Sequence, residues 1–419
     1  MRILVIGKGG REHAIVWALA KSPRITKLFC APGNAGIAQL AEIVPIKESE
    51  FEKIALFAKE QAIDLVVIGP DDPLAEGIVD ALEAQGIPVY GPRKNAAEIE
   101  GSKVFMKALL KKYGIPTAAY ETFDNYEAAL DYLRSQRIPI VIKADGLAAG
   151  KGVVVAFSRE EAEKALNDIM VDKVFGKSGS KVVIEEFLQG QEMSILSFVD
   201  GKVVRPMVPS QDHKQVFDDD KGPNTGGMGT YSPLPHIPQS VIDEAIRTII
   251  QPTAEAMVKE GRPFRGVLFA GLMITEDGPK TIEFNARFGD PETQVVLSLL
   301  ESDLLDIFLA SMDGKLQEAD IRWSEDMAVC VILASGGYPG NYPKGLPISG
   351  LEEVQSSVVF HAGTASRDGQ VVTDGGRVLG VTAKGATIAE AREKAYADAA
   401  RIRFEGMQYR KDIANKALR

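Results

Sequence analysis

The sequence predicts a multidomain protein that joins an α/β domain to α+β domains. Its 419 residues are too many for one hydrophobic core and favour about three domains. Residues 1–101 alternate short apolar strands with helical patterns, which is typical of an N-terminal doubly wound parallel-sheet domain. Residues 102–325 and 326–419 carry strands, glycine-rich turns and helices without that alternation. We therefore expect a central region and a small C-terminal domain of the α+β class.

Composition and charge narrow the functional classes. Hydrophobic residues make up 45% of the chain and charged residues 25%, which excludes a disordered protein. The net charge of −10 argues against nucleic-acid or membrane partners, so an anionic ligand needs a local cluster of cations. No apolar run approaches the roughly 20 residues of a spanning helix, and no signal peptide is recognisable. Cys30 and Cys330 are expected to be reduced core residues, and the protein to be cytoplasmic.

The first domain places three loops at the edge where a parallel sheet binds ligands. Expected strands cover 3–6, 27–31, 65–68 and 88–90, and expected helices follow the first loop and cover about 51–61 and 74–85. Ligands of doubly wound sheets bind beyond the carboxyl ends of the strands. The loops 7–12, 32–36 and 69–73 would lie there.

The loop after the first strand is suited to a phosphate. A strand, a glycine loop and a helix start present backbone N–H groups and a dipole end to an anion, so Gly9, Gly10 and Arg11 are expected to hold one phosphate. A nicotinamide dinucleotide fits less well, because a third glycine and an acidic residue after the second strand are missing. The carboxylates of Glu12 and of loop 69–73 could bind sugar hydroxyls or an amine, or could serve as turn and cap residues.

A glycine-rich loop in the central region carries a lysine at each side. The run 143–152 is almost entirely Gly, Ala, Lys and Asp, with an expected strand before and after it. Such a loop can close over a triphosphate while Lys143 and Lys151 neutralise charge. A flexible hairpin turn is the alternative.

A helix start and a strand end supply further candidates for a nucleotide site. Lys103 lies in the first turn of a helix expected over 103–112, where its charge opposes the helix dipole unless it meets a phosphate. A strand at 181–184 runs into Glu185–Leu188, whose backbone could bind an adenine, and Glu192 could take ribose hydroxyls. Each of these glutamates could instead lie on a solvated strand face.

The most informative stretch is 281–292. Interpreted as the second strand of a β-hairpin, it places Glu283, Asn285 and Arg287 on one face, because side chains alternate along a strand. Ile282 would then face the core. A carboxylate and an amide oxygen suit Mg²⁺, which takes few protein oxygens together with phosphates, and the arginine could hold a phosphoryl group or a carboxylate. An ordinary half-buried strand is the alternative.

Two other regions give less specific signals. The polar run 211–231 is expected to be structureless and functional, because loops of that length are otherwise rare inside a domain. The C-terminal residues show no chemistry of their own. His361 is expected to be packed or hydrogen-bonded rather than a base.

Together these runs resemble the ATP-grasp superfamily and, within it, the phosphoribosylamine–glycine ligases. The runs that carry the resemblance are 9–14, 31–34, 102–103, 143–152, 185–188, 211–214, 222–229, 283–285 and 287–292. They span essentially the whole chain. Asp71 stands where the family usually has Glu, and Gln215 where it often has Arg, which affects only local contacts.

The resemblance implies ATP-grasp central domains and a specific reaction. ATP, glycine and 5-phosphoribosylamine would give glycinamide ribonucleotide, ADP and phosphate through glycyl phosphate, in purine (IMP) biosynthesis. The implied cofactor is Mg²⁺ or Mn²⁺, the partners are these small molecules, and the protein is expected to be a monomer. A mobile lid over about 124–188 would close on ATP and keep water from the acyl phosphate.

The resemblance also implies roles for individual residues. ATP would be bound by Lys103, Lys143, Gly150, Lys151, Gly152, Glu185, Glu186, Phe187, Leu188 and Glu192, and the metal by Glu283 and Asn285. Glycine would be bound by Asp212, Arg287, Gly289 and Asp290, with Arg287, Asp212 and Lys143 as the catalytic set. Phosphoribosylamine would be bound by Gly9, Gly10, Arg11, Glu12, Asn34, Asp71, Asp72 and Pro73.

Three other functions remain open on the sequence. A dinucleotide oxidoreductase would need the acidic residue that is absent after the second strand. A non-catalytic nucleotide-binding protein would not need the metal pair, two lysines and an arginine together. Another ATP-grasp carboxylase or carboxylate–amine ligase of purine synthesis is closer, but the runs 211–229 and 287–292 argue against it.

Overall fold

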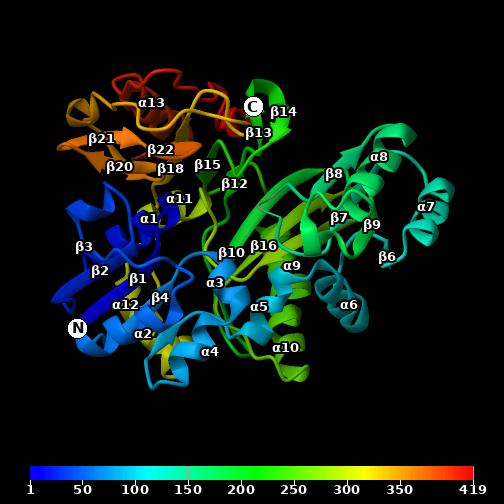
Figure 1. Ribbon diagram of the computed structural model, residues 1–419, viewed down its shortest axis with the longest axis horizontal. Coiled ribbons are helices and arrows are strands. Elements are labelled where there is room, and N and C mark those ends of the chain that lie inside the picture. The colour runs from blue at the N-terminus through cyan, green and yellow to red at the C-terminus, as the bar shows by residue number, and fades with distance from the viewer. Residues whose placement is uncertain (149–150, 419) are drawn as a thin grey trace.

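The computed structural model describes residues 1–148 and 151–418. These residues form an N-terminal domain, a central sheet, a lid and a C-terminal domain, and the lid stands away from the other three (Figure 1). The predicted multidomain architecture is therefore confirmed.

A parallel sheet with the strand order β3-β2-β1-β4-β5 forms the N-terminal domain, as predicted. Its strands are β1 (Arg2–Gly7), β2 (Lys27–Pro32), β3 (Glu42–Ile43), β4 (Leu65–Ile68) and β5 (Val89–Tyr90). Its helices are α1 (Gly10–Leu19), α2 (Phe51–Glu60), α3 (Asp71–Glu76), α4 (Ile78–Glu83) and α5 (Lys94–Gly101). The consecutive residues Ile3 and Leu4 of β1 point to opposite faces of the sheet and pack in different hydrophobic cores. Both faces of the sheet are therefore covered. The single helix expected over 74–85 is wrong, because Gly77 adopts φ 96° and separates α3 from α4.

The lid is a small antiparallel sheet with its own core. Its strand order is β6-β9-β7-β8, and it follows helix α6 (Lys103–Tyr113). The lid elements are β6 (Tyr120–Phe123), α7 (Tyr126–Ser135), β7 (Ile140–Ala144), β8 (Val153–Ala156), α8 (Arg159–Met170) and β9 (Val182–Glu186). Leu133, Ile142 and Leu166 pack in a cluster separate from the other cores, so the lid has a hydrophobic core of its own.

The central sheet is antiparallel and has the order β11-β10-β16-β17. Its strands are β10 (Gln191–Asp200), β11 (Val203–Pro206), β16 (Arg265–Thr275) and β17 (Gly278–Asn285). The nearby helices are α9 (Gln239–Ala245), α10 (Gln251–Lys259), α11 (Glu292–Leu299) and α12 (Leu304–Met312), with a π-helical turn, Ile246–Ile250, between α9 and α10. The predicted hairpin of β16 and β17 is confirmed. Phe308 of α12 stacks on Tyr90, which joins this region to the N-terminal sheet.

The C-terminal sheet has the order β12-β15-β18-β22-β19 and so includes two strands from the central region. The strands of this sheet are β12 (Gln211–Asp212), β15 (Gly229–Ser232), β18 (Met327–Ala334), β19 (Ser357–His361) and β22 (Arg377–Gly385). Two separate two-stranded sheets are formed by β13 (Gln215–Phe217) with β14 (Lys221–Asn224) and by β20 (Thr364–Arg367) with β21 (Gln370–Thr373). The helix of this region is α13 (Ile388–Ala399). The expectation that 211–231 is structureless is therefore wrong. Within this run β12 pairs with β15 and β13 pairs with β14, and β15 also pairs with β18, which lies far along the chain.

Two simpler expectations concern the cysteines and the membrane. Cys30 and Cys330 are both free and buried, as predicted. Among the described residues, no helix has the length and apolar character needed to cross a bilayer.

Candidate active site

A cavity of about 510 Å³ lies where the lid, the central sheet and the two terminal domains meet. The predicted site residues that line it are Arg11, Asp71, Lys103, Lys143, Gly152, Glu185, Glu186, Phe187, Leu188, Glu192, Asp212, Glu283, Asn285, Arg287 and Asp290. Side chains from opposite ends of the chain thus face one space, which is large enough for a nucleotide or a substrate of similar size.

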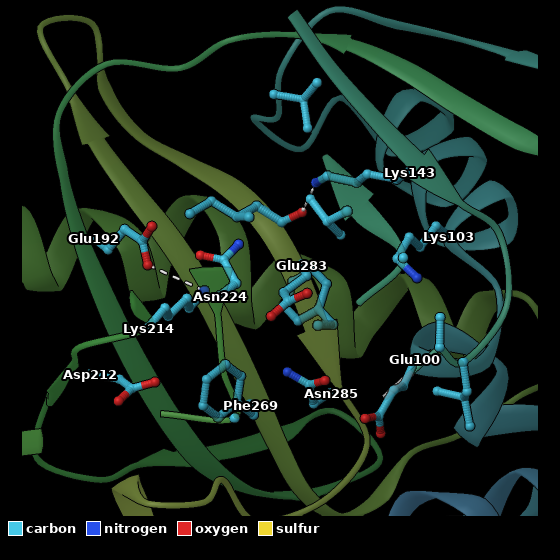
Figure 2. Close-up of a pocket in the computed structure, with 18 of the residues that line it drawn as sticks. Glu100, Lys103, Lys143, Glu192, Asp212, Lys214, Asn224, Phe269, Glu283 and Asn285 are labelled. Carbon is cyan, nitrogen blue, oxygen red and sulfur yellow. Dashed lines mark hydrogen bonds and ion pairs between the residues drawn. The ribbon is translucent and has the colours of Figure 1, made fainter. Parts of the chain in front are cut away.

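Strand β17 carries the two predicted metal ligands into the cavity. Figure 2 shows Glu283 and Asn285 between Lys103 and Lys143 on one side and Lys214 on the other. The carboxylate of Glu283 and the amide of Asn285 therefore lie among the ammonium groups of three lysines.

The expected alternation along β17 is wrong at Ile282. Consecutive residues of β16 pair with Glu283 and Thr281, which skips Ile282 and makes it the extra residue of a β-bulge. Ile282 therefore lines the cavity beside Glu283, while Thr281 takes the fully buried position.

Glu283 is a partly buried carboxylate with several cations around it. Burial alone would raise its pKa, but Lys214, Lys143, Lys103 and Arg287 hold the pKa below its ordinary value. An ionised carboxylate next to an amide oxygen fits a hard cation such as Mg²⁺. In the described part of the chain, no group of three or more His, Cys, Asp or Glu side chains could hold a metal, so most ligands of such an ion would come from substrate and water.

The two predicted phosphate lysines are held by partners near the glycine-rich loop. Lys143 Nζ forms an ion pair with Glu185 and donates a hydrogen bond to Ile282 O at 3.2 Å. Lys103 Nζ donates to Gly146 O at 3.1 Å. Both ammonium groups therefore already lie on the cavity wall, on either side of the loop that is expected to cover the phosphates.

One end of the cavity is apolar. It is lined by Met106, Val141, Leu147, Val153, Val155, Phe187, Leu188 and Met273. A flat aromatic base fits between such walls. Glu192 also lines the cavity and pairs with Lys214 at 3.2 Å, and this carboxylate raises the pKa of Lys214 above its ordinary value.

Arg287 is held by a carboxylate that the sequence did not indicate. Its Nη2 lies 3.0 Å from Glu100 Oε1 and 4.0 Å from Asp71 Oδ2. The other oxygen of Glu100 accepts a hydrogen bond from Ala286 N at 2.8 Å. Burial raises the pKa of Glu100 to about 7, although Arg287 acts in the opposite direction.

The turn at Asp290 connects three parts of the molecule. Asp290 Oδ2 accepts a hydrogen bond from Arg11 N at 3.2 Å, and Asp290 Oδ1 lies 3.4 Å from Arg377 Nη1. Arg377, from the C-terminal domain, also donates to Gly226 O at 2.8 Å. Burial opposes ionisation of Asp290, but Arg377 and Arg11 hold its pKa below the ordinary value.

Asp212, which is partly buried, and Glu292, which is buried, are neighbouring carboxylates that both line the cavity. Burial and the neighbouring Glu292 raise the pKa of Asp212 well above its ordinary value, and burial also raises the pKa of Glu292. An ammonium group placed between them would allow both to ionise. The chemistry of this corner therefore suits an amino group.

Some predicted residues do not line the cavity. In the described chain these are Gly9, Gly10, Glu12, Asn34, Asp72, Pro73, Lys151 and Gly289, and Gly150 lies outside the described residues. Glu12 Oε2 accepts from Gly9 N at 2.7 Å, and Asn34 Nδ2 donates to Lys8 O and His361 O, each at 2.8 Å. Glu12 and Asn34 thus hold loops in place. His361 is buried and hydrogen-bonded to Thr364, as predicted.

The sequence interpretation missed several residues with direct roles in this geometry. They are Glu100, Lys107, Lys214, Glu292 and Arg377. Lys214 and Glu292 belong to the runs that carry the resemblance, which was the available signal. The other three lie in ordinary helices or strands, and only the tertiary structure brings them to the site.

Comparison with protein families agrees with the geometry. Models of the N, ATP-grasp (A) and C domains of phosphoribosylglycinamide synthetase match residues 1–100, 101–293 and 328–416. The phosphoribosylamine–glycine ligase of Caldanaerobacter subterraneus subsp. tengcongensis is 52% identical over 414 residues, 99% of each chain. That of Halalkalibacterium halodurans is 50% identical over 419 residues, 100% of this chain and 97% of the relative.

Solved structures show the same relationship. The phosphoribosylamine–glycine ligase from Thermotoga maritima has a TM-score of 0.88 at 38% identity, over 99% of this chain and 100% of that one. The biotin carboxylase domain of the 2-oxoglutarate carboxylase from Hydrogenobacter thermophilus, with a TM-score of 0.73 at 17% identity over 97% and 91% of the two chains, shares the fold alone. The chain described here belongs to the phosphoribosylglycinamide synthetase (phosphoribosylamine–glycine ligase) family of ATP-grasp enzymes.

Proposed function

We propose that this protein catalyses the ATP-dependent ligation of glycine to 5-phosphoribosylamine, giving glycinamide ribonucleotide, ADP and phosphate in purine biosynthesis. The observation that carries the proposal is the shared cavity. Its central strand presents Glu283 and Asn285, the lid and α6 supply Lys143 and Lys103, and the N-terminal domain supplies Arg11. A nucleotide site and a second anion site thus face each other.

The reaction needs charge neutralisation more than covalent help from the protein. A glycine carboxylate oxygen would attack the γ-phosphorus, forming an O–P bond as the bond to ADP breaks. The amine of phosphoribosylamine would then form the C–N bond of the product, and phosphate would leave. Lys103 and Lys143 would neutralise the nucleotide phosphates, and Arg287 would orient the glycine carboxylate or its acyl phosphate.

We assign the remaining parts of the cavity by their chemistry. The apolar end beside Phe187 and Leu188 would take the adenine, with Glu192 near the ribose. The carboxylate pair of Asp212 and Glu292 would receive the glycine ammonium. The phosphoribosylamine would lie toward Arg11, with its phosphate on the first glycine loop.

A divalent cation, Mg²⁺ or Mn²⁺, would be held by Glu283 and Asn285 and would supply charge stabilisation at the transferring phosphoryl group. Glu283 is ionised in its ring of cations, so its chemistry fits this role. The lid, over about 124–188, would close on ATP and shield glycyl phosphate from water. We further propose that the enzyme acts in the cytoplasm as a monomer.

The test is ADP release from the purified protein in a magnesium buffer with ATP, glycine and freshly generated phosphoribosylamine. Turnover is expected only when all three substrates are present. Glu283→Gln is expected to lower kcat/KM about 100- to 1000-fold, the usual cost of losing one preorganised charge-stabilising group. Turnover that ignores glycine but requires formate or bicarbonate would contradict the substrate assignment and favour another ATP-grasp ligase.

A further inference from the structure

Lys107 belongs to a charged cluster directly behind the proposed nucleotide site. Its ammonium forms an ion pair with Glu185 and donates a hydrogen bond to Thr117 Oγ1 at 2.7 Å. Glu185 also pairs with Lys143, so one carboxylate holds two ammonium groups. The side chains of Lys107, Lys143 and Glu185 are only 0%, 5% and 5% exposed, so this is a buried cluster rather than a surface network.

The two lysines differ in what else they can reach. Lys143 lines the cavity, and its Nζ also contacts Ile282 O on the strand that carries the metal ligands. Lys107 is fully buried on α6, and its second partner, Thr117, is fixed by donating to Thr281 O at 2.8 Å. Only Lys143 can therefore turn toward a ligand, while Lys107 stays on the carboxylate.

The charge balance of the cluster follows from these contacts. Glu185 and Lys143 alone would form a neutral pair and would offer little attraction to a polyphosphate. Lys107 supplies the second cation and leaves one positive charge on the cavity wall. Solvent screens buried charges less than exposed ones, so this difference acts more strongly on a bound anion than a surface charge would. In support, Lys143 and Lys107 hold the pKa of Glu185 below its ordinary value although burial opposes them.

We propose that Lys107 is a positioning residue that neutralises Glu185, so that the charge of Lys143 remains available for the phosphates of the nucleotide. The inference rests on the proposed function, which makes the cavity an ATP site. It assigns a role to a lysine that never touches the ligand.

The test is a charge-rescue cycle measured by direct binding of Mg-ATP and by steady-state kinetics. Lys107→Met removes the second cation, so that Glu185 cancels the charge of Lys143, and is expected to raise both the Kd and the KM for ATP about tenfold, with a smaller effect on kcat. Adding Glu185→Gln to Lys107→Met removes the extra negative charge and is expected to restore most of the affinity. Lys111→Met, which removes an exposed lysine from the same helix, is the matched control and is expected to bind like the wild type.

A merely structural role for Lys107 predicts different results. The double variant would then bind ATP no better than Lys107→Met, and this result would overturn the proposal. Equal ATP affinities of Lys107→Met and Lys111→Met would also overturn it. Thermal unfolding of each variant checks that it is folded. If Lys107→Met does not fold, Lys107→Gln takes its place in the cycle, because glutamine can still hydrogen-bond to Thr117 and Glu185 but carries no charge. An ATP affinity of Lys107→Gln equal to that of the wild type overturns the proposal. A wild-type protein that binds no Mg-ATP would instead contradict the proposed function.

Discussion

At the scale of single residues, Glu100 shows how one buried carboxylate can fix Arg287, the arginine that we propose binds glycine. Its two oxygens contact different groups, Arg287 Nη2 at 3.0 Å and Ala286 N at 2.8 Å. These contacts hold both the backbone and the side chain at the end of β17. The cost is a carboxylate whose charged form is poorly solvated, and burial accordingly raises the pKa of Glu100 to about 7.

This raised pKa predicts a pH-dependent stability. Between about pH 5 and about pH 8 the unfolded chain loses the Glu100 proton before the folded protein does, so stability falls as pH rises. Relative to Glu100→Gln, the wild type is expected to lose about 2 to 3 kcal/mol of unfolding free energy over this range. Denaturant unfolding of both proteins at each pH measures the difference. Glu98→Gln, an exposed change on the same helix, is expected to follow the wild type, and a pH-independent difference for Glu100→Gln would contradict the prediction.

At the scale of elements, the site depends on irregularities in short strands. The β-bulge in β17 turns Ile282 toward the cavity, and β12 and β15 give the run 211–231 a fixed shape through the C-terminal sheet. Gly227, in this run, adopts φ 120°, and a Cβ there would lie 2.5 Å from Pro291 Cδ and 2.7 Å from the Asp212 carboxylate. The two runs that would hold glycine therefore pack too closely for any side chain at this position.

Gly227→Ala is expected to disturb the glycine corner. The variant should lose about 2 to 4 kcal/mol of stability, from backbone strain and overpacking together, and its KM for glycine should rise about tenfold. Gly261→Ala is the control, because Gly261 adopts φ 70° with nothing within 4 Å of the added Cβ. The control should lose only about 1 to 2 kcal/mol and keep its activity. An unchanged KM for glycine in Gly227→Ala would show that the packing does not shape the site.

The sequence predicted regular elements well and their irregular features poorly. Apolar runs such as Leu65–Ile68 and the hairpin of β16 and β17 were found because their signals are local. The bulge at Ile282 could not be predicted, since it depends on how β17 pairs with β16. Strands β12 and β15 were missed because β12 pairs with β15, and β15 in turn pairs with β18, which lies far along the chain.

At the scale of the whole molecule, the cavity is the point where the lid, which has its own core, meets three parts that share theirs. Arg11 comes from the N-terminal domain, Lys143 from the lid, Glu283 from the central sheet and Arg377 from the C-terminal domain (Figure 1). Motifs in the chain predicted most of the site, but not its counter-ions, because those have no pattern apart from the fold. The proposed reaction through an unstable acyl phosphate needs a site that excludes water, and a cavity shared by these parts could provide it once the lid closes.

The formation of glycyl phosphate is tested most directly by following the carboxylate oxygens of glycine. Glycine labelled with ¹⁸O in its carboxylate is supplied with ATP, magnesium and phosphoribosylamine, and the released phosphate is analysed by mass spectrometry. If glycyl phosphate forms, the oxygen that attacked the γ-phosphorus leaves with phosphate, so each phosphate carries one labelled oxygen. Unlabelled phosphate formed together with product would show that glycine is not activated by phosphorylation and would contradict the central claim.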